Sequence, residues 1–65
     1  MNWDQVEGNW KQFVGKARAQ WGELTDDDLA RARGSREQFE GVIQERYGDT
    51  KEEVREKVNK FLDGI

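Results

Sequence analysis

The residues of this sequence with the clearest capacity for chemistry are three consecutive acids, Asp26–Asp28. Carboxylate oxygens are the ligands that Ca²⁺ and Mg²⁺ prefer, so the run is a candidate cation site. An EF-hand loop needs acids at alternating positions, a central Gly and a Glu at its twelfth position, and the run lacks this pattern. We therefore expect neither a metal nor another cofactor. The acids instead place negative charge at the positive end of a helix dipole.

The basic residues Arg31, Arg33 and Arg36 form the only local cluster of cations, and helical pairs with such clusters occur in nucleic-acid binders. Acidic residues surround this cluster, and the whole chain carries a net charge of −3, from 11 Lys and Arg against 14 Asp and Glu. That sign repels phosphate backbones and anionic lipid headgroups. The composition thus disfavours nucleic acid, which stays an alternative partner.

Catalysis has few candidate groups in this sequence. There is no Cys or His to act as nucleophile or general base. The only hydroxyl side chains besides Tyr47 are Thr25, Ser35 and Thr50, and each stands where a helix is expected to begin. We predict a protein that is not an enzyme and has no catalytic residues.

The length and hydropathy limit the architecture. A chain of 65 residues forms one small domain (1–65), which buries only about 60% of the surface of its unfolded chain. No apolar run is long enough for a membrane span or a signal-peptide core. Together with the lack of Cys, this indicates a cytoplasmic protein.

Start and stop signals divide the chain into four short helices, roughly 3–21, 26–33, 36–47 and 51–63. Their expected N-caps are Asn2, Thr25, Ser35 and Thr50. Thr50 with Glu53 matches the capping-box pattern best. Gly22, Gly34 and Gly48 follow the first three helices, and Gly22 is expected to end its helix in the left-handed conformation.

A repeated phrase organises these helices. The segment Gly8–Gly22 aligns with Gly34–Gly48 at an offset of 26 residues (34 − 8), which pairs glycines, a Gln and a core Phe. The repeat predicts an all-α fold with an internal duplication, in units of about 2–33 and 34–65. Each unit would form an αα-hairpin, and the two hairpins would pack face to face to cover their apolar sides.

Apolar residues recur at helical spacing along the predicted helices and mark the side that should be buried. The first helix contributes a narrow aromatic stripe, which we interpret as core rather than as a ligand platform or a membrane-inserting face. The predicted core comprises Trp10, Phe13, Phe39, Val42, Val58 and Phe61.

Three glycines do not fit this scheme. Gly8, Gly15 and Gly41 lie inside predicted helices, away from the apolar stripe, where each costs about 1 kcal/mol relative to Ala. Two explanations remain open. Either another backbone approaches closely at these positions, which makes them a possible contact face, or the helices are loose.

The phrases GNWKQFVGKARAQWGELTDDDL (Gly8–Leu29) and GVIQERYG (Gly41–Gly48) resemble the signature of the CsbD-like family of small bacterial stress-response proteins, and the proteobacterial YjbJ branch most of all. The resemblance covers nearly the whole chain. It implies a compact four-helix protein that accumulates under stress, with no catalytic positions to transfer. The sequence departs from the family at 30–33, which reads ARAR where apolar residues are usual.

These observations favour a non-enzymatic, cytoplasmic stress-response protein that acts by abundance or by contact with an unidentified macromolecule. The first alternative is a hydration-type protectant that is partly disordered, which the mean hydropathy of −1.13 would suit. The second is a nucleic-acid-binding adaptor. Monomer and weak self-association are both compatible with the sequence.

Overall fold

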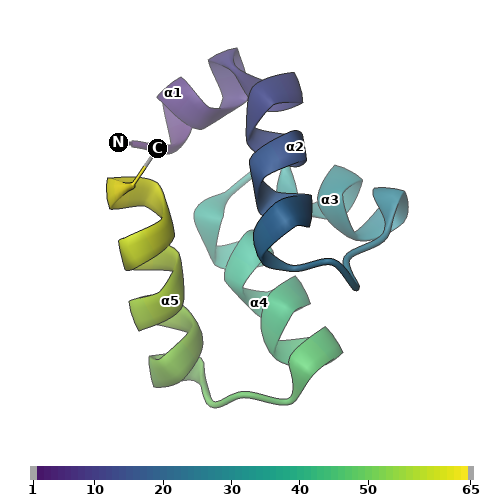
Figure 1. The fold of residues 1–65 in the computed structure, drawn as a ribbon, viewed down its shortest axis with the longest axis vertical. Coiled ribbons are helices and arrows are strands. Elements are labelled where there is room, and N and C mark those ends of the chain that lie inside the picture. Colours follow the sequence, from purple (N-terminus) through teal and green to yellow (C-terminus); the bar gives the residue numbers. More distant parts are fainter. Residues whose placement is uncertain (1, 65) are drawn as a thin grey trace.

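Five helices follow one another in residues 2–64, the part of the chain that this computed structural model describes. Figure 1 shows α4 and α5 joined by a short loop, with α1 and α2 above them and α3 to one side. No strand is present between residues 2 and 64. The helices are α1 (Trp3–Gly8), α2 (Trp10–Gln20), α3 (Asp26–Ala32), α4 (Arg36–Tyr47) and α5 (Lys51–Asp63).

The predicted first helix is two helices, so the expectation of four helices is wrong by one. The chain breaks at Asn9, whose backbone N–H donates to the carbonyls of Gln5 and Val6. The Asn9 side chain also donates to the Gln5 carbonyl, at 3.2 Å. A glycine followed by an asparagine favours such a break, because Gly is a poor helix former and Asn bonds its neighbouring backbone.

Because of this break, α2 and α4 begin at equivalent positions of the repeated phrase. They begin at Trp10 and Arg36, 26 residues apart (36 − 10), which is the offset of the repeated phrase. Their caps differ, however, because the Ser35 side chain accepts from the Gln38 N–H whereas the Asn9 side chain makes no capping bond. The internal duplication therefore stays a prediction.

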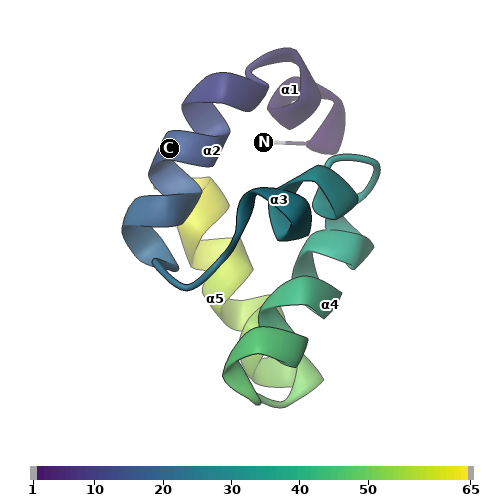
Figure 2. The same cartoon turned by 90° about the vertical axis from the view of Figure 1, so that its right-hand side faces the viewer.

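The third helix packs mainly against α4, not along α2 as the hairpin scheme expected. Figure 2 shows α3 lying in front of α4, with α5 behind. The loop between α2 and α3 allows this placement, because Trp21 ends α2 with φ −126° and Leu24 donates back to the Trp21 carbonyl. Gly22 is therefore not left-handed, and the only glycine of residues 2–64 with positive φ is Gly48, at 72°.

Side chains from all five helices meet in one core. Phe39 is fully buried, and its ring lies within 6 Å of three other aromatic rings, those of Trp3, Phe13 and Trp21. Among the predicted core residues, Phe13, Phe39, Val42 and Val58 are buried, whereas Trp10 and Phe61 are half-buried at the edge.

α3 contributes two apolar residues to the core despite the charged residues around them. Leu29 and Ala32 are buried, although Arg31 and Arg33 alternate with alanine in the same segment. None of the helices within residues 2–64 has the length and apolar character needed to cross a membrane.

Candidate functional site

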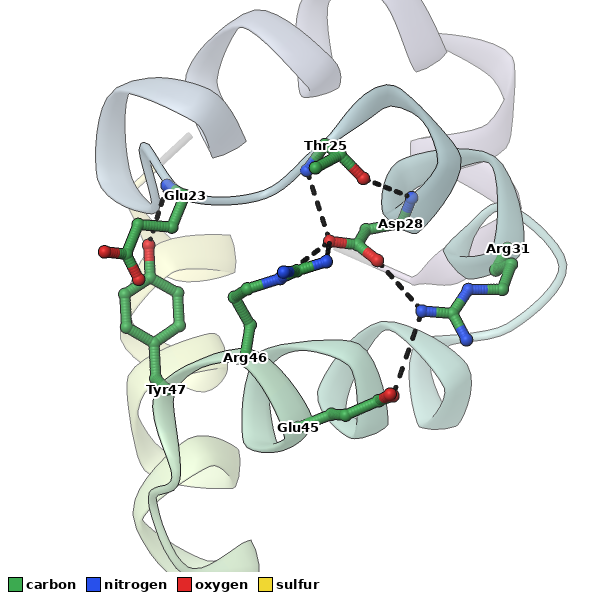
Figure 3. A network of polar contacts seen from close by, with 7 residues as sticks. All are labelled: Glu23, Thr25, Asp28, Arg31, Glu45, Arg46 and Tyr47. Carbon is green, nitrogen blue, oxygen red and sulfur yellow. Dashed lines mark hydrogen bonds and ion pairs between the residues drawn. The ribbon is translucent and has the colours of Figure 1, made fainter.

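The candidate site is built on Asp28, which is 3% exposed and is the only charged residue buried among residues 2–64. Its carboxylate accepts hydrogen bonds from two arginines. Arg31 donates to Oδ1 at 2.9 Å, and Arg46 donates to Oδ2 through Nη2 at 2.8 Å and Nε at 3.1 Å. Figure 3 shows both guanidinium groups pointing at the carboxylate, from α3 and α4.

Local sequence places the carboxylate where these arginines meet. Thr25 caps α3 by accepting from the Asp28 N–H at 3.1 Å, and Asp28 reaches back to accept from the Thr25 N–H at 3.2 Å. This reciprocal capping box holds the Asp28 side chain at the start of α3, turned toward α4. Arg46, in the last turn of α4, then joins the two helices.

The electrostatics of the site follow from this geometry. Burial is the largest single influence on Asp28 and acts to raise its pKa, because it disfavours the charged form. The hydrogen bonds from Thr25, Arg31 and Arg46, with the charge of Arg46, outweigh burial and lower the pKa from 3.8 to about 2. Asp28 is therefore a carboxylate throughout the physiological range.

Two further contacts extend the site. Arg31 lies 3.8 Å from the Glu45 carboxylate, so it links Asp28 to the exposed side of α4. The Glu23 N–H donates to the Tyr47 hydroxyl at 3.0 Å, which fixes the loop before α3 to the end of α4 (Figure 3). Together these contacts fasten α3 and its preceding loop to α4.

The acid run does not converge on one point. Asp26 forms an ion pair with Arg18, Asp27 is exposed, and Asp28 is enclosed in its own network. Within residues 2–64, no three acidic side chains are grouped in a way that could hold a metal ion.

The predicted basic cluster is dispersed in the fold. Arg31 pairs with Asp28, while Arg33 lies 6.0 Å from the ring centroid of Trp10. Arg36 pairs with Glu40 at 2.8 Å and also donates to Asn59. Three arginines close in sequence thus contact different partners in the fold.

The three glycines of the predicted contact face are exposed, at different places. Gly8 is the last residue of α1 and so lies at the end of a helix. Gly15 and Gly41 do lie inside α2 and α4. A Cβ built on any of the three meets no atom within 4 Å, so no backbone of residues 2–64 packs closely against them.

From the sequence, Asp28 is expected only to be one of three acids in the first turn of a helix. A signal was available, because Asp28 stands three residues after Thr25 and an acid at this position can complete a capping box. Nothing in the sequence around Arg46 indicates that its side chain contacts Asp28. It follows Asp28 by 18 residues and meets it only because α3 lies against α4.

Comparisons with known proteins give a consistent family. The model of the CsbD-like family matches residues 4–56. A UPF0337 protein of Bordetella pertussis is 57% identical over 63 residues, covering 97% of this chain and 96% of its own length. The UPF0337 protein YjbJ of Escherichia coli K12 is 53% identical over 58 residues, covering 89% and 84%. No solved structure matches this chain.

Proposed function

Since this chain belongs to the CsbD-like family, we propose that it is a non-enzymatic, cytoplasmic stress-response protein that acts as a folded unit, through its abundance and its surface. The stress role comes from the resemblance to that family. The non-enzymatic part comes from the residues, and the two parts are tested separately below.

The state of Asp28 carries the non-enzymatic part of the proposal. A general acid or base needs a pKa near the operating pH and an open path to its proton. Asp28 has a pKa of about 2, and the hydrogen bonds that it accepts come from Thr25, Arg31 and Arg46 of its own chain. The most perturbed carboxylate of the described residues thus joins helices and is unsuited to proton transfer.

The packed core supports a protein that works folded, in preference to the hydration-type alternative. Phe39, Ile43, Val54 and Val58 have no exposed surface, and burial of such side chains is the main force that favours a folded chain. A far-UV circular dichroism spectrum in dilute buffer should show a helical protein with a cooperative thermal transition. A coil spectrum that becomes helical only on drying would favour the protectant.

A complementation experiment tests the function. A strain lacking its own family member receives wild type, Phe39→Ala to disrupt the core, or Lys51→Ala as an exposed control, at matched protein levels. Survival after osmotic shock or desiccation should fail with the first variant and persist with the second. Full protection by Phe39→Ala would contradict a role for the fold.

The same strain distinguishes a stoichiometric role from catalysis. A protein that acts by abundance should protect in proportion to its copy number, so a graded promoter should give a graded survival curve. An enzyme turns over, so a small amount should protect almost fully. Protection that saturates at trace expression would therefore contradict the non-enzymatic part alone.

A further inference from the structure

The charge of the molecule is divided unequally among its helices. α2 carries Lys11, Lys16 and Arg18 and contains no acidic residue. The rest of the chain holds eight of the eleven cations and all fourteen acids, a formal charge of −6 (8 − 14). Arg18 pairs with Asp26 of the same chain, so the positive surface of this helix comes mainly from Lys11 and Lys16.

Gly15 lies at the centre of that positive surface. At 100° per residue it is opposite the buried side of α2, which is formed by Phe13 and Ala17. Lys11 lies one turn before it, and Arg18 one turn after. Because nothing in the described chain lies within 4 Å of a Cβ at Gly15, the glycine weakens the helix without improving internal packing.

Gly41 has the same position on α4, with the opposite charge around it. It lies opposite Phe39 and Ile43, with Glu37 one turn before and Glu45 one turn after. Two hollows, of about 440 and 220 Å³, are both lined by Gly41. The two hollows, which we call the Gly41 groove, share this glycine, and their lining includes three acids, Glu37, Glu40 and Glu45, and two cations, Arg31 and Lys51.

The two surfaces are complementary in position as well as in charge. At the offset of 26 residues, Gly15 corresponds to Gly41 and Lys11 to Glu37. A glycine at the centre of each face would let the helix backbones approach closely, as small residues do at tight helix–helix contacts. Oppositely charged residues would then meet one turn away from the crossing point.

We propose that copies of this chain associate head to tail, with the basic face of α2 in one copy seated in the Gly41 groove of the next. α2 and α4 contact each other through Phe13 and Phe39 on their buried sides, and Gly15 and Gly41 lie on the other side of each helix, so one chain cannot bring its own two faces together. A contact between two unlike faces leaves one of each free and can extend beyond a dimer. This proposal goes beyond the stress role and does not depend on it.

A second copy fits the positive face better than a polyanion does. A nucleic acid at α2 would bring its phosphates toward a molecule with a charge of −6 outside that helix. It would also leave the Gly41 groove without a function. A second copy would contact both Gly15 and Gly41 and would bring the basic residues of α2 against the acidic residues of α4.

Glycine substitutions test the close approach. Gly15→Ala and Gly41→Ala should leave the fold intact, because a Cβ at either position meets nothing within the chain. Each should lower the association constant about tenfold, or about 1.4 kcal/mol, measured by sedimentation at up to about 1 mM protein and low ionic strength. Gly8→Ala is the matched control, since Gly8 is equally open but lies outside both faces, and it should associate like wild type.

Charge reversal tests the pairing of the two faces. One variant combines Lys11→Glu with Lys16→Glu, and the other combines Glu37→Lys with Gln44→Lys. Each alone should stay monomeric, because both of its faces then carry the same sign. The equimolar mixture should associate, because each reversed face meets the unreversed face of the other variant.

Three results would overturn the proposal. The first is a wild-type chain that stays monomeric at about 1 mM and low salt, whether or not its α2 face binds duplex DNA. The second is self-association that the Gly15 and Gly41 variants do not weaken. The third is a mixture of charge variants that stays monomeric while wild type associates. None of these results would bear on survival under stress, so the proposed function is tested independently.

Discussion

Two regions hold the five helices together, and they use different interactions. The first is an aromatic cluster contributed by α1, α2, α4 and α5, formed by the rings of Trp3, Trp10, Phe13, Trp21, Phe39 and Phe61. The second is the Asp28 network, which joins α3 to α4. Every helix takes part in one of the two regions, and α4 takes part in both.

The difference between them lies in how strictly each specifies geometry. Apolar burial depends on area and has little directional preference, so the aromatic cluster brings the helices together without fixing their angles narrowly. The carboxylate of Asp28 requires donors at defined positions, because a buried charge without partners is costly. We infer that the cluster supplies most of the stability, while the network sets how α3 lies on α4.

The largest expected effect comes from the aromatic cluster. Phe39→Ala should lower the free energy of unfolding by about 3–5 kcal/mol, because the residue is completely buried and its ring contacts rings from α1 and α2. That is a large share of the stability of a domain this small. Urea denaturation followed by circular dichroism measures the loss. Phe61→Ala, at the half-buried edge, should cost less, and equal losses would contradict a core centred on Phe39.

The network should give the next largest effect, with a particular order among its arginines. Arg46→Ala should cost about 2–3 kcal/mol, because it removes two bonds to a buried carboxylate. Arg31→Ala should cost less, since Arg31 gives one bond to Asp28 and its side chain is 58% exposed. A double-mutant cycle of Arg46 with Asp28 should show coupling of about 1 kcal/mol or more. Additive losses would mean that the network does not act as a unit.

A pH titration separates the two regions, because the network contains the ionisable carboxylate of Asp28 whereas the Trp and Phe rings of the aromatic cluster do not ionise. The folded pKa of Asp28, about 2, lies below its ordinary value of 3.8. Its contribution is therefore complete above pH 3.8 and is lost as the pH falls from there toward 2. The melting temperature of Asp28→Asn should depend less on pH across this window than that of wild type. Parallel curves would show that the buried carboxylate contributes nothing.

The aromatic cluster and most helix bounds could be predicted from the sequence, because they follow local rules. Phe13 and Phe39 lie on apolar stripes with helical spacing, and Thr25, Ser35 and Thr50 precede helices that begin where a capping hydroxyl predicts. The break at Asn9 was missed because a glycine and an asparagine lower helix stability without excluding a continuous helix.

The network could not be predicted in the same way. Whether Asp28 is buried depends on α3 lying across α4, and helical periodicity describes only the faces of one helix at a time. Ion pairs at the surface were equally hard to predict from helical spacing alone. Lys57 was within reach of Glu53 by i,i+4 spacing, yet it pairs with Asp49 at 2.7 Å, and that contact raises its pKa.

The smallest predicted effect reverses the order that sequence rules give for two caps. Thr50 with Glu53 matches the capping-box pattern best, but in the fold Glu53 Oε1 accepts from the Thr50 hydroxyl at 3.0 Å instead of reaching the Thr50 backbone N–H. Thr25 forms the complete box, and its partner Asp28 is the centre of the network. Thr25→Ala should thus cost about 1–2 kcal/mol and Thr50→Ala about 0.5–1 kcal/mol.

Chemical denaturation of both variants measures the two losses, and Thr25→Ser and Thr50→Ser serve as controls that keep the capping oxygen. The reason for the order is geometric. Loss of the Thr25 hydroxyl frees the first turn of α3, so the Asp28 carboxylate is held less firmly against Arg46, and part of the cost comes from the network. Loss of the Thr50 hydroxyl affects only the exposed first turn of α5. A larger loss for Thr50→Ala would show that the cap of α3 and the Asp28 network are energetically independent.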